Sequence, residues 1–199
     1  DEAGRGCVLG PLVMAGVVVT EDKRNLLIDW GVQDSKTFGS SKKAQVTRAN
    51  LAEKILDQFE SSISVVSSVI VDTYVQNSSL NILEQETAQK IISNHPSELT
   101  VLDGENLFRP LVTDSVIARN KADQDFASVS AASIIAKVER DRQLDALCSP
   151  FQDGFGEIKG GGYANAKTLE FVKWYLEKFK KLPEFYRKSY NWKALSREN

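Results

Sequence analysis

The chain has 199 residues, is 42% hydrophobic and carries a formal net charge of −2, which suits one domain with a sizeable core and a small appendage. No apolar run reaches the roughly 18 to 20 residues of a membrane span, and the slightly acidic balance argues against a nonspecific nucleic-acid binder. Two isolated cysteines, Cys7 and Cys148, argue against a disulfide framework and favour a reducing compartment.

The N-terminal half predicts two strands and two helices. A valine-rich run at residues 9–20 is typical of a buried strand. A helix should start at Ser40 or Ser41, either of which can cap it, and run to about residue 59. Alternating β-branched residues at 62–71 predict a second strand, and residues 80–93 predict a second helix. The expected core residues are Val46, Leu51, Ile55 and Phe59 in the first helix and Leu83, Ile91 and Ile92 in the second.

The C-terminal half continues the mixture of strands and helices. Short apolar strands are expected at residues 99–102 and 115–118, and a long helix at 128–147. A further helix at 165–180 should face the core with one stripe, made of Leu169, Val172, Leu176 and Phe179. Strands mixed with helices imply an α/β layer architecture.

Charge and glycine content divide the chain near residue 157. A glycine-rich segment at 154–162 separates a body, residues 1–157, from a basic helical region, residues 158–199. Residues 159–199 hold ten Lys/Arg and four Asp/Glu, a balance of +6, which leaves −8 for the remainder. The basic region could hold a phosphate backbone or be a helix with a solvated lysine face, and charge alone does not decide between them.

The one histidine limits the chemistry. His95 lies in a Ser-Asn-His-Pro sequence, which is typical of a helix end on the surface because proline blocks continuation. Multi-histidine zinc sites are excluded, and a Ser-His or Cys-His nucleophile would depend on this residue alone. Hydrolysis is therefore expected to use carboxylates and metal-activated water.

Four carboxylates fall near predicted strand ends, where open α/β sheets place their sites. Asp1, Glu2, Asp103 and Asp123 would supply hard oxygen ligands for two Mg²⁺ or Mn²⁺ ions. Neighbouring strand residues point to opposite faces, so the strand must end or twist if the first two are to share a site. Spacing alone also permits ordinary caps and turns.

Three short motifs each have two interpretations. Gly4-Arg5-Gly6 is either a tight turn or a loop whose backbone approaches a ligand closely. The sequence Gly160–Tyr163 is either a flexible linker or a mount for a tyrosine that stacks on a sugar or base. Asp34-Ser35-Lys36 is either a turn or a phosphate contact through Lys36.

Together these motifs resemble the type 2 ribonucleases H, specifically the ribonuclease HII family. The matching blocks are DEAGRG at 1–6, GPLV at 10–13, DSK at 34–36, LN at 80–81, LDG at 102–104, KADQDFASVSAASIIAKVERDRQ at 121–143 and GGGY at 160–163. The resemblance covers nearly the whole chain in order. The KAD form and RKSYNWK at 187–193 are most similar to archaeal and eukaryotic members.

The resemblance implies roles for individual residues. It implies a ribonuclease H-like mixed β-sheet flanked by helices, with metal ligation by Asp1, Glu2, Asp103 and Asp123 and with Asp125 as a bystander. It further implies that the backbone of Gly4, Arg5 and Gly6 reads a ribonucleotide 2′-hydroxyl. Tyr163 would stack on the sugar of the following deoxynucleotide. Lys36 would contact phosphate, and Lys42 or Lys43 is a further candidate for that role.

The implied activity is endonucleolytic hydrolysis of RNA in RNA–DNA hybrids, including single ribonucleotides in duplex DNA. Metal-activated water would attack 5′ of the ribonucleotide and leave a 3′-hydroxyl and a 5′-phosphate, a reaction of ribonucleotide excision in DNA replication and repair. A monomer in the cytoplasm is expected, or in the nucleus if the source is eukaryotic, with accessory subunits not excluded. The alternative is a catalytically weak protein that binds hybrids.

The sequence departs from the family pattern in its tyrosine loop and at its start. Family members usually have GSGYPSDP around the tyrosine, whereas Ala164-Asn165-Ala166 follows it here. Without those prolines the loop should be freer, so holding Tyr163 should cost more entropy. Cys7 and Val8 replace the usual proline and small residues. Because a ligand such as Asp1 needs a supporting strand before it, residues preceding it are expected in the natural protein.

Overall fold

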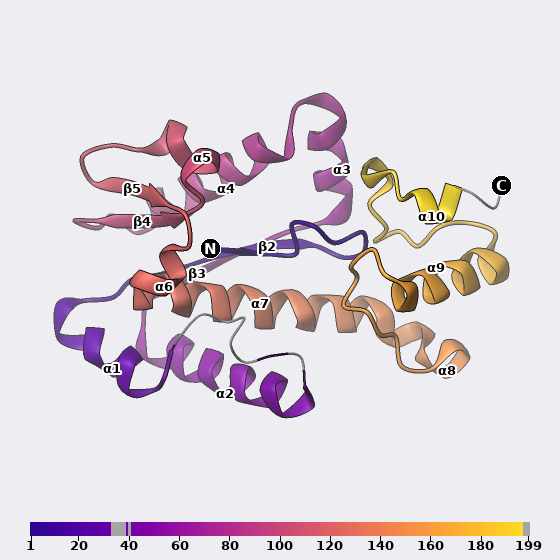
Figure 1. Ribbon diagram of the computed structural model, residues 1–199, viewed down its shortest axis with the longest axis horizontal. Helices are drawn as coiled ribbons and strands as arrows, with labels where there is room; N and C mark the ends of the chain where they lie inside the picture. Colours follow the sequence, from indigo (N-terminus) through magenta and orange to yellow (C-terminus); the bar gives the residue numbers. More distant parts are fainter. Residues whose placement is uncertain (33–38, 40, 197–199) are drawn as a thin grey trace. The chain divides into compact units, whose positions relative to one another are not determined.

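The computed structural model describes residues 1–32, 39 and 41–196, and the chain forms two compact units (Figure 1). Unit 1 consists of Asp1–Ala3, Val13–Ser64 and Asn81–Glu139. Unit 2 consists of Gly4–Leu12, Val65–Leu80 and Arg140–Asn199. The division into residues 1–157 and 158–199 stays a prediction about domains.

The strands of unit 1 form two small sheets. One has the order β1 (Glu2–Ala3), β2 (Leu12–Val17) and β3 (Ser61–Val66), with β1 antiparallel to β2. The other is the parallel pair β4 (Thr100–Asp103) and β5 (Val116–Arg119), in which Asp103 lies opposite Arg119. A parallel pair needs a crossover, and α5 (Glu105–Phe108) with the 3₁₀ turn Arg109–Leu111 lies in that connection.

Helices cover both faces of the unit 1 strands. Figure 1 shows α7 (Ala127–Cys148) running between β2 and α2 (Lys42–Gln58), with α4 (Leu80–Asn94) on the other side of the strands. One core joins β2, α2 and α7 through Val13, Ile55 and Ile134. A second joins Met14 to residues of α4, β4, α5 and β5. Alanines of α7 at 131, 132 and 136 let that helix lie close to the sheet, because their side chains are small.

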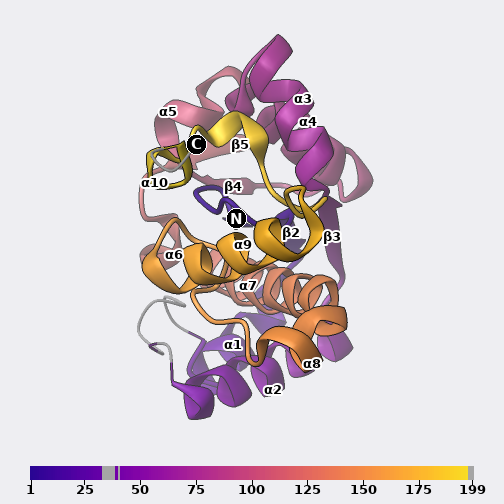
Figure 2. The same ribbon diagram turned by 90° about the vertical axis from the view of Figure 1, so that its right-hand side faces the viewer.

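Unit 2 has an aromatic core. Its helices are α3 (Ser68–Asn77), the end of α7, α8 (Gln152–Phe155), α9 (Ala166–Phe179) and α10 (Lys193–Ser196), and Figure 2 turns α9 and α10 toward the viewer. Phe171 of α9 is fully buried and stacks on Phe185 with ring centroids 6.3 Å apart. Phe151 and Tyr175 pack edge to face at 5.1 Å. Val8 and Leu9 extend this core, so the N-terminal segment Gly4–Leu12 is anchored among C-terminal residues.

The structure confirms most of the predicted elements and corrects three details. Residues 67–71 are not strand, because Ser67 accepts a hydrogen bond from the Ile70 amide and caps α3. Val46 is 60% exposed rather than buried. In the stripe predicted for α9, Val172 is buried as expected, but Leu169 and Leu176 are only partly buried and Phe179 is 40% exposed, because the aromatic core packs against an adjacent face. That face consists of Thr168, Phe171, Val172 and Tyr175.

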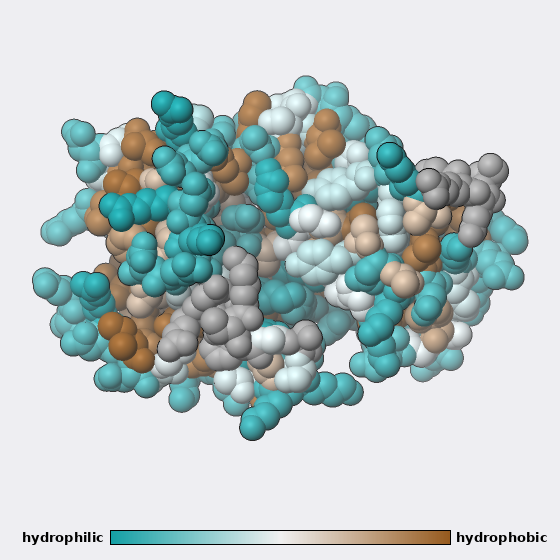
Figure 3. Space-filling model, in the orientation of Figure 1, coloured by the Kyte–Doolittle hydropathy of each residue, from teal (hydrophilic) through white to brown (hydrophobic). Residues whose placement is uncertain are grey.

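The remaining helix, α1 (Arg24–Asp29), is short and precedes the residues that are not described. Among the described residues, no helix has both the length and the apolar character that crossing a bilayer requires. The face in Figure 3 shows hydrophobic side chains between many hydrophilic ones. Exposed apolar residues are normal on folded proteins, so they indicate no particular ligand.

Candidate functional site

Three of the predicted carboxylates lie together in unit 1. Asp1, Asp103 and Asp123 each offer a carboxylate oxygen, and these oxygens all lie within 4.8 Å of one another. They come from segments that are far apart in the chain: the start of the protein, the end of β4 and the short helix α6 (Ala122–Asp125). The fold therefore assembles this cluster, and no local sequence motif does so alone.

Backbone pairing fixes Asp1. Its amino group donates to the Ala15 carbonyl at 3.1 Å, and the Ala15 amide donates back to its carbonyl at 3.0 Å. One oxygen of its side chain accepts a hydrogen bond from the Glu2 amide at 2.7 Å. The carboxylate is thus oriented by a neighbour, while its backbone continues the ladder that β1 makes with β2.

A hydrogen bond to the start of α6 fixes Asp103. Its Oδ1 accepts from the Ala122 amide at 3.0 Å, which joins the end of β4 to the first turn of that helix. Asp123 lies in the same turn and is 4% exposed. Ser130 of α7 donates a short hydrogen bond to the Asp123 carbonyl, so the serine of the SAAS sequence supports the turn that presents this carboxylate.

The electrostatics of the cluster favour cations. Burial lowers the pKa of the Asp1 amino group, while Glu2, Asp103 and Asp123 oppose that shift. Clustered carboxylates repel one another unless positive charge lies between them. Hard carboxylate oxygens at this separation are the donor set that Mg²⁺ and Mn²⁺ prefer, so the residues present fit a divalent metal.

Glu2 is not part of this group of three carboxylates. It lies in β1, opposite Met14, and the next residue of a strand points its side chain to the other face. The negative charge of Glu2 nevertheless opposes the lowering of the pKa of the Asp1 amino group by burial.

A cavity of about 160 Å³ lies beside the carboxylates within unit 1. Asp1 and Asp103 contribute to one part of its wall, and His95 contributes to another. Most of the wall is apolar and comes from β2, α4 and β4, including Val17, Ile91 and Val101. The cavity therefore separates the edge of β2 from the edge of β4.

His95 is less exposed than the sequence suggested. Its side chain is 16% exposed and bridges two residues at the start of β3. The ring lies 2.5 Å from the Ser62 hydroxyl and 2.8 Å from a carboxylate oxygen of Glu60. His95 directly follows the last residue of α4, so the predicted helix end is confirmed, but its side chain is partly buried and its contacts tie the end of α4 to β3.

In unit 2, Gly4-Arg5-Gly6 forms a turn that only glycine permits at its first position. Gly4 has φ +88°, and a Cβ there would lie 2.7 Å from the Pro11 carbonyl oxygen. The Cys7 amide closes the turn by donating to the Gly4 carbonyl at 3.2 Å. Gly6 is exposed, and a Cβ there would meet no atom within 4 Å.

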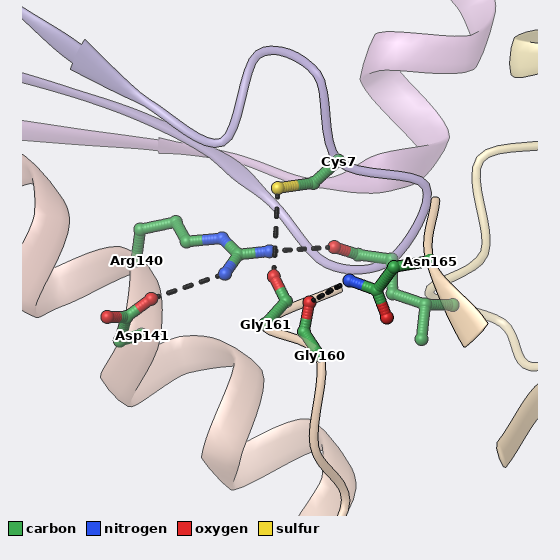
Figure 4. A network of polar contacts seen from close by, with 7 residues as sticks. Cys7, Arg140, Asp141, Gly160, Gly161 and Asn165 are labelled. Carbon is green, nitrogen blue, oxygen red and sulfur yellow. Dashed lines mark hydrogen bonds and ion pairs between the residues drawn. The ribbon is translucent and has the colours of Figure 1, made fainter. Parts of the chain in front are cut away.

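The tyrosine loop is pinned to the N-terminal segment of unit 2. The amides of Val8 and Leu9 donate to the Gly162 carbonyl at 2.8 and 3.1 Å, and the Cys7 thiol contacts the Gly161 carbonyl at 3.7 Å. Figure 4 shows this contact and the Asn165 amide group, which donates to the Gly160 carbonyl at 2.8 Å. These bonds restrain a loop that lacks the family prolines; how freely it moves stays a prediction.

Arg140 contacts both the N-terminal segment and the ring of Tyr163. It is 1% exposed, donates to the Leu9 carbonyl at 3.1 Å and pairs with Asp141 at 3.2 Å (Figure 4). Its guanidinium carbon lies 5.9 Å from the centre of the Tyr163 ring, which remains 46% exposed. Burial raises the pKa of Tyr163. Arg140 lies in the long matching block, but sequence reasoning assigned it no role.

The remaining predicted contacts are less informative. Lys36 lies outside the described residues. Asp125 is exposed in α6 and is absent from the carboxylate cluster, and Lys42 and Lys43 are exposed at the start of α2. The bystander role of Asp125 and the lysine contacts stay predictions.

Comparisons with known proteins cover nearly the whole chain. A family model described as Ribonuclease HII matches residues 1–193. A relative from Methanobrevibacter smithii with the same name is 36% identical over 202 residues, which cover 96% of this chain and 92% of the relative.

Solved structures show the same fold. The PCNA:RNase HII complex from Archaeoglobus fulgidus contains a chain that is 35% identical, with a TM-score of 0.83 over 100% of this chain and 95% of that one. Ribonuclease H2 from Pyrococcus horikoshii OT3 is 28% identical, with a TM-score of 0.81 over 100% of this chain and 97% of that one. The expected ribonuclease H-like α/β fold is confirmed.

Proposed function

This chain belongs to the ribonuclease HII family of metal-dependent ribonucleases, which act on RNA–DNA hybrids, and we propose that it also cleaves at single ribonucleotides within duplex DNA. The observation that carries the proposal is the meeting of Asp1, Asp103 and Asp123 within 4.8 Å. The cleaved bond is the phosphodiester 5′ of a ribonucleotide.

The carboxylates would hold one or two divalent ions, Mg²⁺ or Mn²⁺. We place Asp1, Asp103 and Asp123 as ligands, and Glu2 as a fourth whose side chain turns toward the ion on binding. A divalent cation in this position supplies Lewis-acid activation of water and neutralises charge at the phosphate. The protein keeps the ligands in place: the Glu2 amide orients Asp1, and the Ala122 amide orients Asp103.

The reaction is a hydrolysis in which the phosphodiester and one water molecule are the only reactants. The oxygen of water bonds to phosphorus, the bond from phosphorus to the upstream 3′-oxygen breaks, and that oxygen takes a proton. The products are a 3′-hydroxyl and a 5′-phosphate. Catalysis of this kind depends on positioning and charge stabilisation more than on covalent chemistry by the protein.

The turn and the tyrosine loop would read the sugar. The turn Gly4-Arg5-Gly6 presents backbone close to a ligand, and the 2′-hydroxyl is the group that distinguishes RNA from DNA at one residue. Tyr163, about half exposed, would stack on the next deoxyribose. Lys36 would contact a phosphate.

Assembly with a partner is a separate proposal. The Archaeoglobus fulgidus relative was solved as a complex with PCNA. We propose that this chain is catalytically competent as a monomer, and that an additional protein would serve to deliver it to DNA.

One duplex tests the function. A labelled DNA duplex with a single ribonucleotide is incubated with Mg²⁺, with Mn²⁺ or with chelator, alongside an all-DNA duplex of the same sequence. The expected result is metal-dependent nicking directly 5′ of the ribonucleotide. Binding without cleavage in either metal would support the alternative, a catalytically weak hybrid-binding protein.

A further inference from the structure

The carbonyl of Arg5, in the middle of the glycine turn, is held by two side chains from the C-terminal segment of unit 2. Arg187 Nη1 donates to it at 3.1 Å, and the Tyr190 hydroxyl donates to it at 2.7 Å. The two donors also contact each other at 3.0 Å. Both belong to the RKSYNWK motif, to which the proposed reaction gives no role.

Arg187 spans the N-terminal segment from one end to the other. It is fully buried, and its Nε donates to the Gly10 carbonyl at 3.1 Å while Nη1 holds Arg5. Backbone hydrogen bonds run alongside, from the Arg187 amide to the Val8 carbonyl and from the Gly10 amide to the Phe185 carbonyl. Segment 5–10 is therefore fixed at both ends by one planar guanidinium.

Burying this group costs free energy. Burial lowers the pKa of Arg187, and its Nη2 atom is buried without a hydrogen-bond partner among the described residues. The ring of Tyr190, 5.2 Å from the guanidinium, offsets part of that cost. Arg187 is a buried cation that donates to backbone carbonyls of segment 5–10. We infer that the conformation of this segment is important for function.

Asp72 of α3 fixes the two donors in turn. Its carboxylate accepts hydrogen bonds from the Lys188 amide at 2.9 Å, the Ser189 amide at 3.0 Å and the Ser189 hydroxyl at 2.6 Å. These groups start the 3₁₀ turn Lys188–Tyr190, so the carboxylate caps the element that carries Tyr190 and follows Arg187. The supports thus run from α3 to the Arg5 carbonyl.

The turn is consequently set before any ligand arrives. The Gly4 carbonyl accepts from Cys7 and the Arg5 carbonyl accepts from two side chains, so two successive peptide groups have defined orientations. A preorganised site loses less conformational freedom on binding than a flexible one. A flexible turn would therefore show a smaller difference in affinity between a ribose and a deoxyribose.

We propose that Arg187 and Tyr190 are positioning residues that set the Gly4-Arg5-Gly6 turn for discrimination between ribose and deoxyribose. The inference rests on the proposed reading of the 2′-hydroxyl by that turn. In this role Arg187 and Tyr190 do not touch the substrate. They act by holding the turn that does.

The test compares Tyr190→Phe with a matched control, Tyr175→Phe, which removes the same hydroxyl from the aromatic core of unit 2. Affinity is measured in chelator for a duplex with one ribonucleotide and for an all-DNA duplex. Tyr190→Phe should lower the ratio of the two affinities roughly 3- to 10-fold, the worth of one hydrogen bond, with all-DNA affinity unchanged. Tyr175→Phe should leave the ratio as it is.

Amide hydrogen exchange at residues 5–10 provides a second readout, with Arg187→Lys as the second variant, because a lysine cannot reproduce the forked guanidinium contacts. Faster exchange there in Tyr190→Phe and Arg187→Lys, but not in Tyr175→Phe, supports positioning. An unchanged ratio in folded Tyr190→Phe, or an equal loss in the control, overturns it. If the wild type shows no preference for the ribonucleotide-containing duplex, the proposed reading of the 2′-hydroxyl is wrong. The hydrogen-exchange result alone then tests whether Arg187 and Tyr190 position the turn.

Discussion

Asp1 pairs with Ala15 through two backbone hydrogen bonds, one in each direction, at 3.1 and 3.0 Å. This pairing extends the antiparallel ladder, in which Glu2 lies opposite Met14, by one further residue. Beyond it the apolar cavity continues along Gly16 and Val17 of β2 and along Val18, which follows that strand. Asp1, which we propose as a metal ligand, is therefore held by backbone pairing with β2 beside an apolar cavity.

Adding three extended apolar residues, Ile-Ala-Val, before Asp1 should stabilise unit 1. They can continue the ladder with β2, and one buried branched side chain contributes about 2 kcal/mol. They also replace a buried amino group, whose pKa burial lowers, with a neutral amide. Denaturant unfolding measures the gain against a Gly-Ser-Gly extension of equal length, and equal stability of the two would contradict the pairing.

Asp103→Asn should lower the cleavage rate roughly 10³-fold while the protein stays folded, because an amide is a poorer metal ligand than a carboxylate. The Ala122 amide can still donate to the remaining oxygen, so the link from β4 to α6 survives. Nicking assays and thermal unfolding check the two halves of this prediction. Asp125→Asn is the control, since it makes the same change at an exposed carboxylate of α6, which lies outside the carboxylate cluster; a comparable loss there would argue against the assignment.

Glu2→Gln tests whether the residue next to Asp1 is a ligand. If Glu2 is a ligand, its replacement should weaken metal affinity, so activity should fall most at low metal concentration and raising Mg²⁺ or Mn²⁺ should restore part of the rate. As a strand residue facing away from the cluster it should have no such dependence. A titration of activity against metal in wild type and variant distinguishes the two.

Cys148 should resist alkylation in the folded protein. Burial, followed by the charge of Asp145, raises the pKa of its thiol to about 12, so at pH 8 only about one molecule in 10⁴ carries the reactive thiolate. The folded-state pKa lies above the unfolded value of 9.0, so the thiol contributes stability below pH 9 that is lost as the pH rises toward 12. Iodoacetamide labelling mapped by mass spectrometry, native against denatured, would contradict this if native Cys148 reacted rapidly at pH 8.

The sequence predicts the site best where local pattern and chemistry coincide. The strand before Asp103 ends in Asp-Gly, so the position of this carboxylate follows from the pattern of apolar residues. The position of Asp123 required the family resemblance, because a left-handed Lys121 and a short helix present it. The role of Glu2 does not follow from the sequence. Neighbouring residues of a strand point to opposite faces, whereas the motif implies that Glu2 and Asp1 share one site.

Contacts between distant segments could not be predicted. Arg187 and Arg5 are 182 residues apart, and nothing local to RKSY indicates that it holds a turn near the N-terminus. The buried face of α9 differs from the predicted stripe for a similar reason: Phe151 and Phe185, from outside the helix, pack against Phe171 and Tyr175. Helical periodicity predicts that α9 has one buried face, but it does not identify the side chains that pack against that face.

Replacement by alanine should have different effects at the two glycines of the turn. Gly4→Ala puts a Cβ 2.7 Å from the Pro11 carbonyl at φ +88°, so it should cost at least ~1–3 kcal/mol of stability. Gly6→Ala adds a methyl group where no atom lies within 4 Å, so it should leave stability within about 0.5 kcal/mol. If Gly6 is glycine because the substrate approaches its backbone, this second variant should still bind the ribonucleotide-containing duplex more weakly. Stable Gly6→Ala protein with wild-type affinity and nicking would show that the exposed side of the turn does not contact the substrate.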